Sequence, residues 1–63
     1  MNKLEQYIKQ NDLKKVAVAR RLGISDAHLR NLRKGDAKPS PSLAKLIEIE
    51  TEGAVPETEW GYQ

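Results

Sequence analysis

The chain has 63 residues, a length that indicates one small domain. Hydrophobic residues make up 38% and charged residues 32%, a balance typical of globular domains that argues against a disordered tail. There is no cysteine and only one histidine, which excludes disulfides and argues against a structural zinc site. The longest apolar run, Val16 to Ala19, cannot span a bilayer. We therefore expect no membrane segment, no secretion leader and no cofactor.

Charge is distributed unevenly along the chain. All eleven Lys and Arg residues lie at or before Lys45 with only four acidic residues, so residues 1–45 carry a net charge of +7. The remaining eighteen residues hold five glutamates and no basic residue, a net charge of −5. A basic part joined to an acidic end is typical of a polyanion-binding protein. Chance scatter of charge in a small protein gives the same pattern, so charge alone leaves both interpretations open.

The first half of the chain predicts two helices. Residues 2–10 form the first, with Asn2 as its N-cap and Glu5 three places on. The second helix is expected to start early, capped by Asp12, and to stop at Gly23. The inner face of the first helix holds Leu4, Tyr7 and Ile8, and the apolar residues of the second are Leu13, Val16, Ala17, Val18, Ala19 and Leu22. Its outer surface is basic, with Lys14, Lys15, Arg20 and Arg21.

The second half predicts two more helices and a turn. Ser25 is a good N-cap for a third helix that ends near Lys34 before Gly35. A fourth helix is expected from about Pro41 to Thr51, with Leu43, Leu46 and Ile47 facing inward. A last short turn opens at Pro56 and carries Trp60. No segment of the sequence shows the alternation of apolar and polar residues that is typical of a strand. The sequence therefore predicts an all-α fold of four helices plus a short C-terminal turn.

The spacing between the second and third predicted helices suits a tight corner. Two helices that meet steeply over a short turn need a small residue where their backbones approach, which is Ala19, and a glycine in the turn, which is Gly23. The apolar residues that close the corner are Val18, Leu22, Ile24, Leu29 and Leu32. This arrangement turns the polar face of the third helix outward.

Residues 15–34 resemble the helix-turn-helix of the phage Cro and repressor family, whose signature positions hold Ala19, Gly23, Ile24, Leu29 and Leu32 here. Residues 24–27 are similar to the recognition-helix opening of some all-helical Cro proteins, and residues 52–55 resemble a turn of small prophage Cro/YdaS-like regulators. The likeness covers roughly residues 4–60. It implies a lambda-repressor-like helix-turn-helix DNA-binding domain over residues 1–63, cytoplasmic in a bacterial host.

The resemblance also implies that the third helix, from about Ser25 to Lys34, enters the major groove of DNA. Family positions near the bases correspond to Ser25, Asp26, Ala27, Arg30, Asn31 and Lys34. Arg30 suits guanine O6 and N7, Asn31 suits adenine, and Ala27 suits a thymine methyl. Asp26 leaves two interpretations open: it accepts from cytosine N4, or it caps the helix and repels phosphate.

A second group of residues is expected to contact DNA phosphates. Its members are Lys14, Lys15, His28, Arg33 and Lys38. For a single lysine of this group, a solvated basic face is an equally good interpretation. The sequence departs from the family at Lys14, where Thr or Ser is usual, and at Glu50, an inward-looking place. The latter suggests that Ile49 is exposed and could contribute to a dimer surface.

The function expected from these features is that of a phage or prophage Cro-type repressor, which binds specific double-stranded DNA and has no enzymatic activity. The expected partner is a pseudo-palindromic operator bound by a homodimer, and whether that dimer forms only on DNA stays open. No small-molecule ligand is expected. Trp60 and Tyr62 either cover the core or join a dimer contact. The alternative function is a protein-interaction or antitoxin-like adaptor that uses the same helix face, which the polar, basic set of outward residues disfavours.

Overall fold

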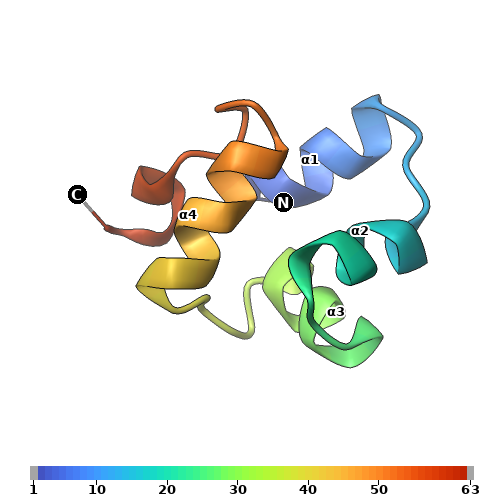
Figure 1. Cartoon of the computed structure of the whole chain (residues 1–63), viewed down its shortest axis with the longest axis horizontal. Coiled ribbons are helices and arrows are strands. Elements are labelled where there is room, and N and C mark those ends of the chain that lie inside the picture. The colour runs from blue at the N-terminus through green and yellow to red at the C-terminus, as the bar shows by residue number, and fades with distance from the viewer. Residues whose placement is uncertain (1, 63) are drawn as a thin grey trace.

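The computed structural model of the protein describes residues 2–62 and contains, in that range, four α-helices, one 3₁₀ helix and no strand. The elements are α1 (Lys3–Gln10), α2 (Lys15–Leu22), α3 (Asp26–Lys34), α4 (Pro41–Glu50) and the 3₁₀ helix η1 (Glu57–Trp60). Helices α1, α2 and α3 lie on one side of the molecule and α4 with η1 on the other (Figure 1). The predicted all-α fold with four helices and a C-terminal turn is confirmed.

Most helices begin at a side-chain cap. The capping residues are Asn2 for α1, Ser25 for α3 and Ser40 for α4, and each side-chain oxygen accepts the backbone N–H three residues on. Helix α2 has Lys14 at its N-cap and no side-chain cap hydrogen bond. The prediction that Asp12 caps an early-starting α2 is therefore wrong. Asp12 lies in the turn after α1 with a φ of 51°, and its N–H donates to the Lys9 carbonyl.

Each α-helix contributes two residues to a buried apolar core, and the C-terminal segment adds two more. These residues are Leu4, Ile8, Ala19, Leu22, Leu29, Leu32, Ala44, Ile47, Val55 and Trp60. Two of the apolar residues assigned to the second helix are exposed and lie outside the core: Leu13 is 38% exposed and Val16 is 50% exposed. Ala17 is exposed as well. Four consecutive apolar residues point to all sides of a helix, so only Ala19 and Leu22 of α2 become buried.

The fourth helix and the C-terminal segment close the core from the other side. Leu43 and Leu46 are half-buried, whereas Ala44 and Ile47 are fully buried. The Thr51 hydroxyl donates to the Ile47 carbonyl at 2.7 Å and accepts from the backbone N–H of Val55 at 3.1 Å, which holds the C-terminal segment against α4.

The C-terminal aromatic residues belong to the core. Trp60 is 9% exposed and lies among the core residues, and the half-buried Tyr62 packs against them. Trp60 Nε1 is buried without a hydrogen-bond partner in the described part of the chain. Of the two roles left open by the sequence, covering the core is the one that this packing supports. No helix within residues 2–62 is long and apolar enough to cross a membrane.

Candidate nucleic-acid interface

The corner between α2 and α3 is built as the sequence predicts. Ala19 is 2% exposed where the two helices meet, and its carbonyl accepts the backbone N–H of Ile24 at 3.0 Å. Gly23 ends α2 with a φ of 71°, in the left-handed region. A Cβ placed on this glycine would meet nothing within 4 Å, so the backbone conformation, not space, requires glycine here. The corner fixes the direction in which α3 leaves α2.

Helix α3 has one buried and one exposed face. Leu29 and Leu32 are 1% and 0% exposed and anchor the helix to the core. All six residues expected near the bases are exposed: Ser25, Asp26, Ala27, Arg30, Asn31 and Lys34. Residues 26, 27, 30, 31 and 34 follow helical spacing and so share one face. The structure thus brings the expected reading residues together, and their contact with bases stays a prediction.

The start of α3 shows how its first residues divide their roles. Ser25 Oγ accepts the backbone N–H of His28 at 3.0 Å, while the hydroxyl proton stays available to a partner. The hydrogen-bonded cap is therefore Ser25, so Asp26 does not supply the cap that one interpretation gave it. Asp26 lies in the first turn, where its charge favours the positive end of the helix dipole.

The residues expected to contact phosphates do not share one environment. Lys14, Lys15 and Lys38 are exposed, and His28 is half-buried. Lys14 and Lys15 lie at the first turn of α2, and Lys38 lies in the loop after α3. Exposed basic side chains thus lie at the start of α2, at the end of α3 with Lys34, and in the loop after α3.

Arg33 lies in a different setting from the one expected. Its Nε and Nη2 donate to Oε1 and Oε2 of Glu5 at 2.5 and 3.4 Å, and the two side chains are only 15% and 14% exposed. The hydrogen bond and charge of Arg33, opposed by desolvation, lower the pKa of the Glu5 carboxyl below its ordinary value. Arg33 is therefore not expected to contact a phosphate, because its charge is already paired with that of Glu5 and its side chain joins α3 to α1.

Asn2 adds a second link between α1 and α3. Its Oδ1 caps α1 through the backbone N–H of Glu5, and its Nδ2 donates to the carbonyl of Leu32 at 2.6 Å. One asparagine thus satisfies a free donor of α1 and a terminal carbonyl of α3. The sequence predicted the first role, but the second pairs residues 30 positions apart and left no local signal.

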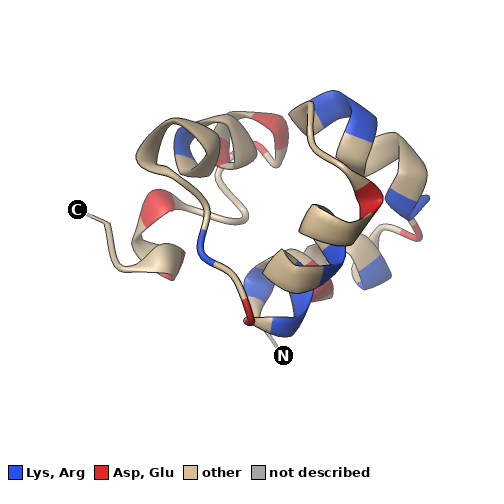
Figure 2. Cartoon of the chain, turned by 90° about the horizontal axis from the view of Figure 1, so that it is seen from below, with Lys and Arg blue, Asp and Glu red and all other residues tan. Residues whose placement is uncertain are grey.

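The charge separation seen along the sequence is also a separation in space. Lys and Arg gather over α1, α2, α3 and the loop after α3, while Asp and Glu predominate on α4 and η1 (Figure 2). Part of the acidic end has structural roles: Glu48 Oε1 accepts the Glu57 N–H at 2.8 Å, and Glu59 Oε2 accepts the Lys3 N–H at 3.0 Å. Within residues 2–62, no group of three or more His, Asp or Glu residues suits a metal ion.

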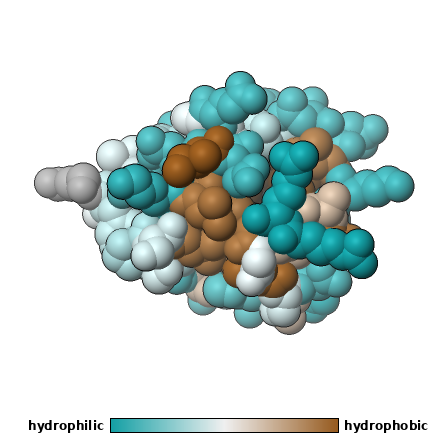
Figure 3. All heavy atoms as spheres, in the orientation of Figure 1, coloured by the Kyte–Doolittle hydropathy of each residue, from teal (hydrophilic) through white to brown (hydrophobic). Residues whose placement is uncertain are grey.

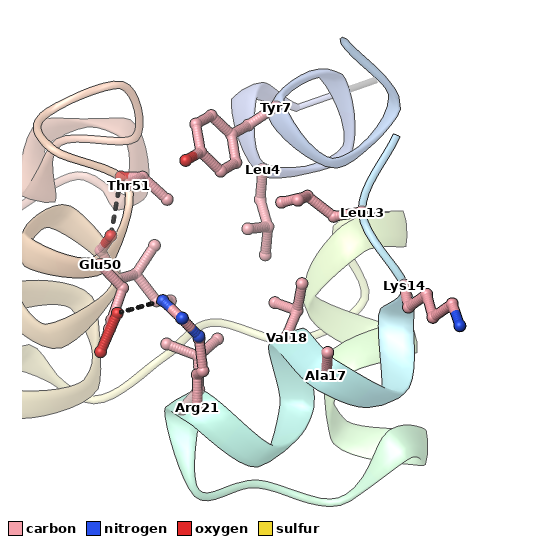
Figure 4. A pocket seen from close by; sticks show the side chains of 11 residues that line it. Leu4, Tyr7, Leu13, Lys14, Ala17, Val18, Arg21, Glu50 and Thr51 are labelled. Carbon is pink, nitrogen blue, oxygen red and sulfur yellow. Dashed lines mark hydrogen bonds and ion pairs between the residues drawn. The ribbon is translucent and has the colours of Figure 1, made fainter. Parts of the chain in front are cut away.

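A hollow lies between α1, α2 and α4, which sequence reasoning missed because its walls come from three separate elements. Its volume is about 310 Å³, and its apolar lining includes Leu4, Tyr7, Leu13, Ala17 and Val18. Apolar surface is visible in the middle of this face (Figure 3). An exposed ion pair at 3.5 Å between Arg21 and Glu50 stands at its edge (Figure 4). No residue of α3 lines it, and Lys14 is the one candidate phosphate contact among its lining residues.

A sequence model of the helix-turn-helix family matches residues 4–59. Since this match covers most of the chain, the protein belongs to that family and has a lambda-repressor-like helix-turn-helix fold. The family consists of DNA-binding regulators of transcription and is typically not enzymatic. None of the curated proteins and none of the solved structures compared with the chain gives a significant match.

Proposed function

We propose that this protein is a sequence-specific, Cro-type repressor that reads the major groove of double-stranded DNA with α3 and blocks transcription by occupying an operator. The observation that carries the proposal is the exposed face of α3, which holds five of the six expected reading residues, with Ser25 at its N-cap, while Leu29 and Leu32 anchor the helix. The resemblance of residues 52–55 to small prophage regulators supports a phage or prophage setting.

The proposed base contacts follow from the chemistry of the exposed side chains. Arg30 donates two hydrogen bonds to guanine, and Asn31 pairs with the N6 and N7 edge of adenine. Ala27 lies against a thymine methyl, and Asp26 accepts from cytosine N4 or serves only the helix dipole. Ser25 and Lys34 flank this set. Lys34 stays available because its pair with Asp36, at 3.6 Å, joins two exposed side chains and contributes little.

The proposed phosphate contacts lie on both sides of the reading face. Lys14 and Lys15 supply them at the start of α2, His28 on α3, and Lys38 in the loop that follows. Arg33 is left out of this set because Glu5 already pairs with it. Contacts before and after α3 would fix the depth and direction of the helix in the groove.

The outer face of α3 favours DNA over a protein partner. Its exposed residues between Asp26 and Lys34 include no apolar side chain larger than that of Ala27. Protein-docking faces depend on a central apolar or aromatic anchor, usually surrounded by polar residues. The adaptor function therefore has no specific observation in its favour at this face.

We further propose that two copies occupy one pseudo-palindromic operator, because one copy offers too few contacts for tight specific binding. The two recognition helices would then read half-sites about one helical turn apart. Ile49 on α4 is 64% exposed and is a candidate contact between the copies.

Selection of bound sequences from a random duplex pool, followed by affinity measurements over a salt series, tests the proposal. Arg30→Ala should reduce discrimination between selected and scrambled duplexes by about 1 to 3 kcal/mol. Lys38→Ala should weaken both duplexes alike and lower the salt slope by about one. The control is Lys45→Ala, which removes an exposed lysine of α4 and should change neither result. Equal affinity of the unaltered protein for both duplexes would refute the specific-repressor function.

A further inference from the structure

The loop between α3 and α4 is held in place by the C-terminal end of the chain. The hydroxyl of Tyr62 donates a hydrogen bond of 2.8 Å to the carbonyl of Pro39, which lies 23 positions earlier and is fully buried. Trp60, two residues before the tyrosine, is part of the core. The start of η1 is bound to α4 through the contact of the Glu57 N–H with Glu48. Tyr62 therefore projects from an anchored segment.

Lys38, in the same loop, lies over the face of this tyrosine. Its Nζ is 4.6 Å from the centroid of the Tyr62 ring, a distance suited to a cation–π interaction. A Cβ placed on Gly61 would stand 3.8 Å from the same Nζ, so the backbone of Gly61 also borders the ammonium. Lys38 is nevertheless exposed. The ring thus restrains the side chain and leaves its charge accessible.

We propose that Tyr62 is a positioning residue for DNA binding, which fixes the loop after α3 and presents the Lys38 ammonium to a phosphate of the duplex. The inference rests on the proposed function, in which Lys38 is a phosphate contact. A lysine side chain loses rotamer freedom when a phosphate fixes it, and a ring that already restricts the side chain reduces this loss. The hydrogen bond to Pro39 sets the position of the loop from which Lys38 extends.

A double-mutant cycle on the full chain tests the inference, with Tyr62→Leu, Lys38→Ala and the double variant bound to a mixed-sequence duplex over a salt series. Tyr62→Leu should weaken binding about two- to fivefold when Lys38 is present. In the Lys38→Ala background it should have no further effect. The matched control is Tyr7→Leu, the same change beside the hollow, which should leave DNA affinity unchanged. An equal loss in both backgrounds would overturn the inference, because a merely structural role is additive.

A measurement on the unaltered chain keeps the inference testable if Tyr62→Leu does not fold. In the NMR spectrum, the ring current of Tyr62 should shift the methylene protons of Lys38 beside Nζ upfield. Ordinary lysine shifts there would overturn the inference. Failure of the proposed function has a different signature, since the unaltered protein would then bind selected and scrambled duplexes equally or bind neither. If it binds duplex DNA but Lys38→Ala changes neither affinity nor salt slope, the positioning role alone is wrong.

Discussion

At the scale of single residues, Arg33 shows how one side chain in a basic segment acquires a structural role. It follows Leu29 by four positions and Leu32 by one, which places it beside the buried stripe of α3. That spacing could have indicated an inward side chain. The partner, Glu5, lies 28 residues away on another helix, so the ion pair itself has no local signature in the sequence.

The Glu5–Arg33 pair predicts a pH-dependent contribution to stability. The folded protein holds the Glu5 carboxyl at a pKa below the ordinary value of 4.5. The charged form is therefore favoured by folding, and its contribution is present above pH 4.5 and is lost as the pH falls through the lower, folded-state pKa. Glu5→Gln should reduce the free energy of unfolding by about 1 kcal/mol at neutral pH. The difference in free energy of unfolding between Glu5→Gln and the unaltered protein should become smaller in acid.

Urea unfolding at neutral pH and at pH values below the Glu5 pKa measures the loss of stability in Glu5→Gln and its decrease in acid. Glu52→Gln, which removes a carboxylate from an exposed position, is the matched control and should have little effect at either pH. A Glu5→Gln deficit that stays constant down to the acid limit would contradict the role given to the charged carboxylate.

At the scale of elements, the sequence predicted the type and order of the helices better than their inward faces. Caps and glycines are local features, and Ser25, Gly23 and Ser40 all lie where the sequence predicts a helix to begin or end. The inward face of α2 was harder to predict, because four consecutive apolar residues point to all sides of a helix. Only contact with other elements decides that Ala19 is buried and Val16 exposed.

The candidate interface was predictable to a similar extent. The exposed positions of the residues expected to read bases could be predicted, because helical spacing puts those within α3 opposite Leu29 and Leu32. The links that hold this helix could not, since Asn2 with Leu32 and Tyr62 with Pro39 join residues 30 and 23 positions apart. Local pattern thus predicted which side chains face outward, while only tertiary packing specifies what holds their helix.

The uncapped start of α2 predicts a substitution that improves stability but impairs binding. Lys14 has the extended backbone of an N-cap, with φ of −78° and ψ of 127°, but makes no side-chain cap hydrogen bond. Lys14→Ser should supply that bond and raise the free energy of unfolding by about 1 kcal/mol. The same change removes a proposed phosphate contact, so affinity for all duplexes should fall.

Chemical unfolding and duplex binding of the same preparations separate the two effects. Lys14→Gln is the matched variant, because it removes the charge without introducing a favourable cap. It should lose affinity as Lys14→Ser does and gain no stability. Unchanged binding in both variants would show that Lys14 is not a phosphate contact.

At the scale of the whole molecule, size limits how two copies can meet on DNA. The fold measures 28 × 21 × 20 Å over its Cα atoms. Half-sites one helical turn apart place the two centres about 34 Å from each other. Even with their long axes along the duplex, two copies can share only a narrow contact, smaller than stable dimers generally need.

We therefore expect the free protein to be a monomer and the operator complex to contain two copies. Sedimentation of the free protein and of its complex with a selected duplex measures both states. A duplex with one half-site scrambled should bind a single copy, with only a modest loss of affinity at the intact half. A stable dimer in the absence of DNA would contradict this expectation.

The links from Asn2 to Leu32 and from Tyr62 to Pro39 bring both ends of the described chain to the last turn of α3 and the loop beyond it. A bulky label attached beside Asn2 or Tyr62 would therefore lie close to the surface proposed to face the duplex. The exposed turn at Glu52 and Gly53 follows the opposite end of α4. A dye or spin label introduced there would report on binding without obstructing it.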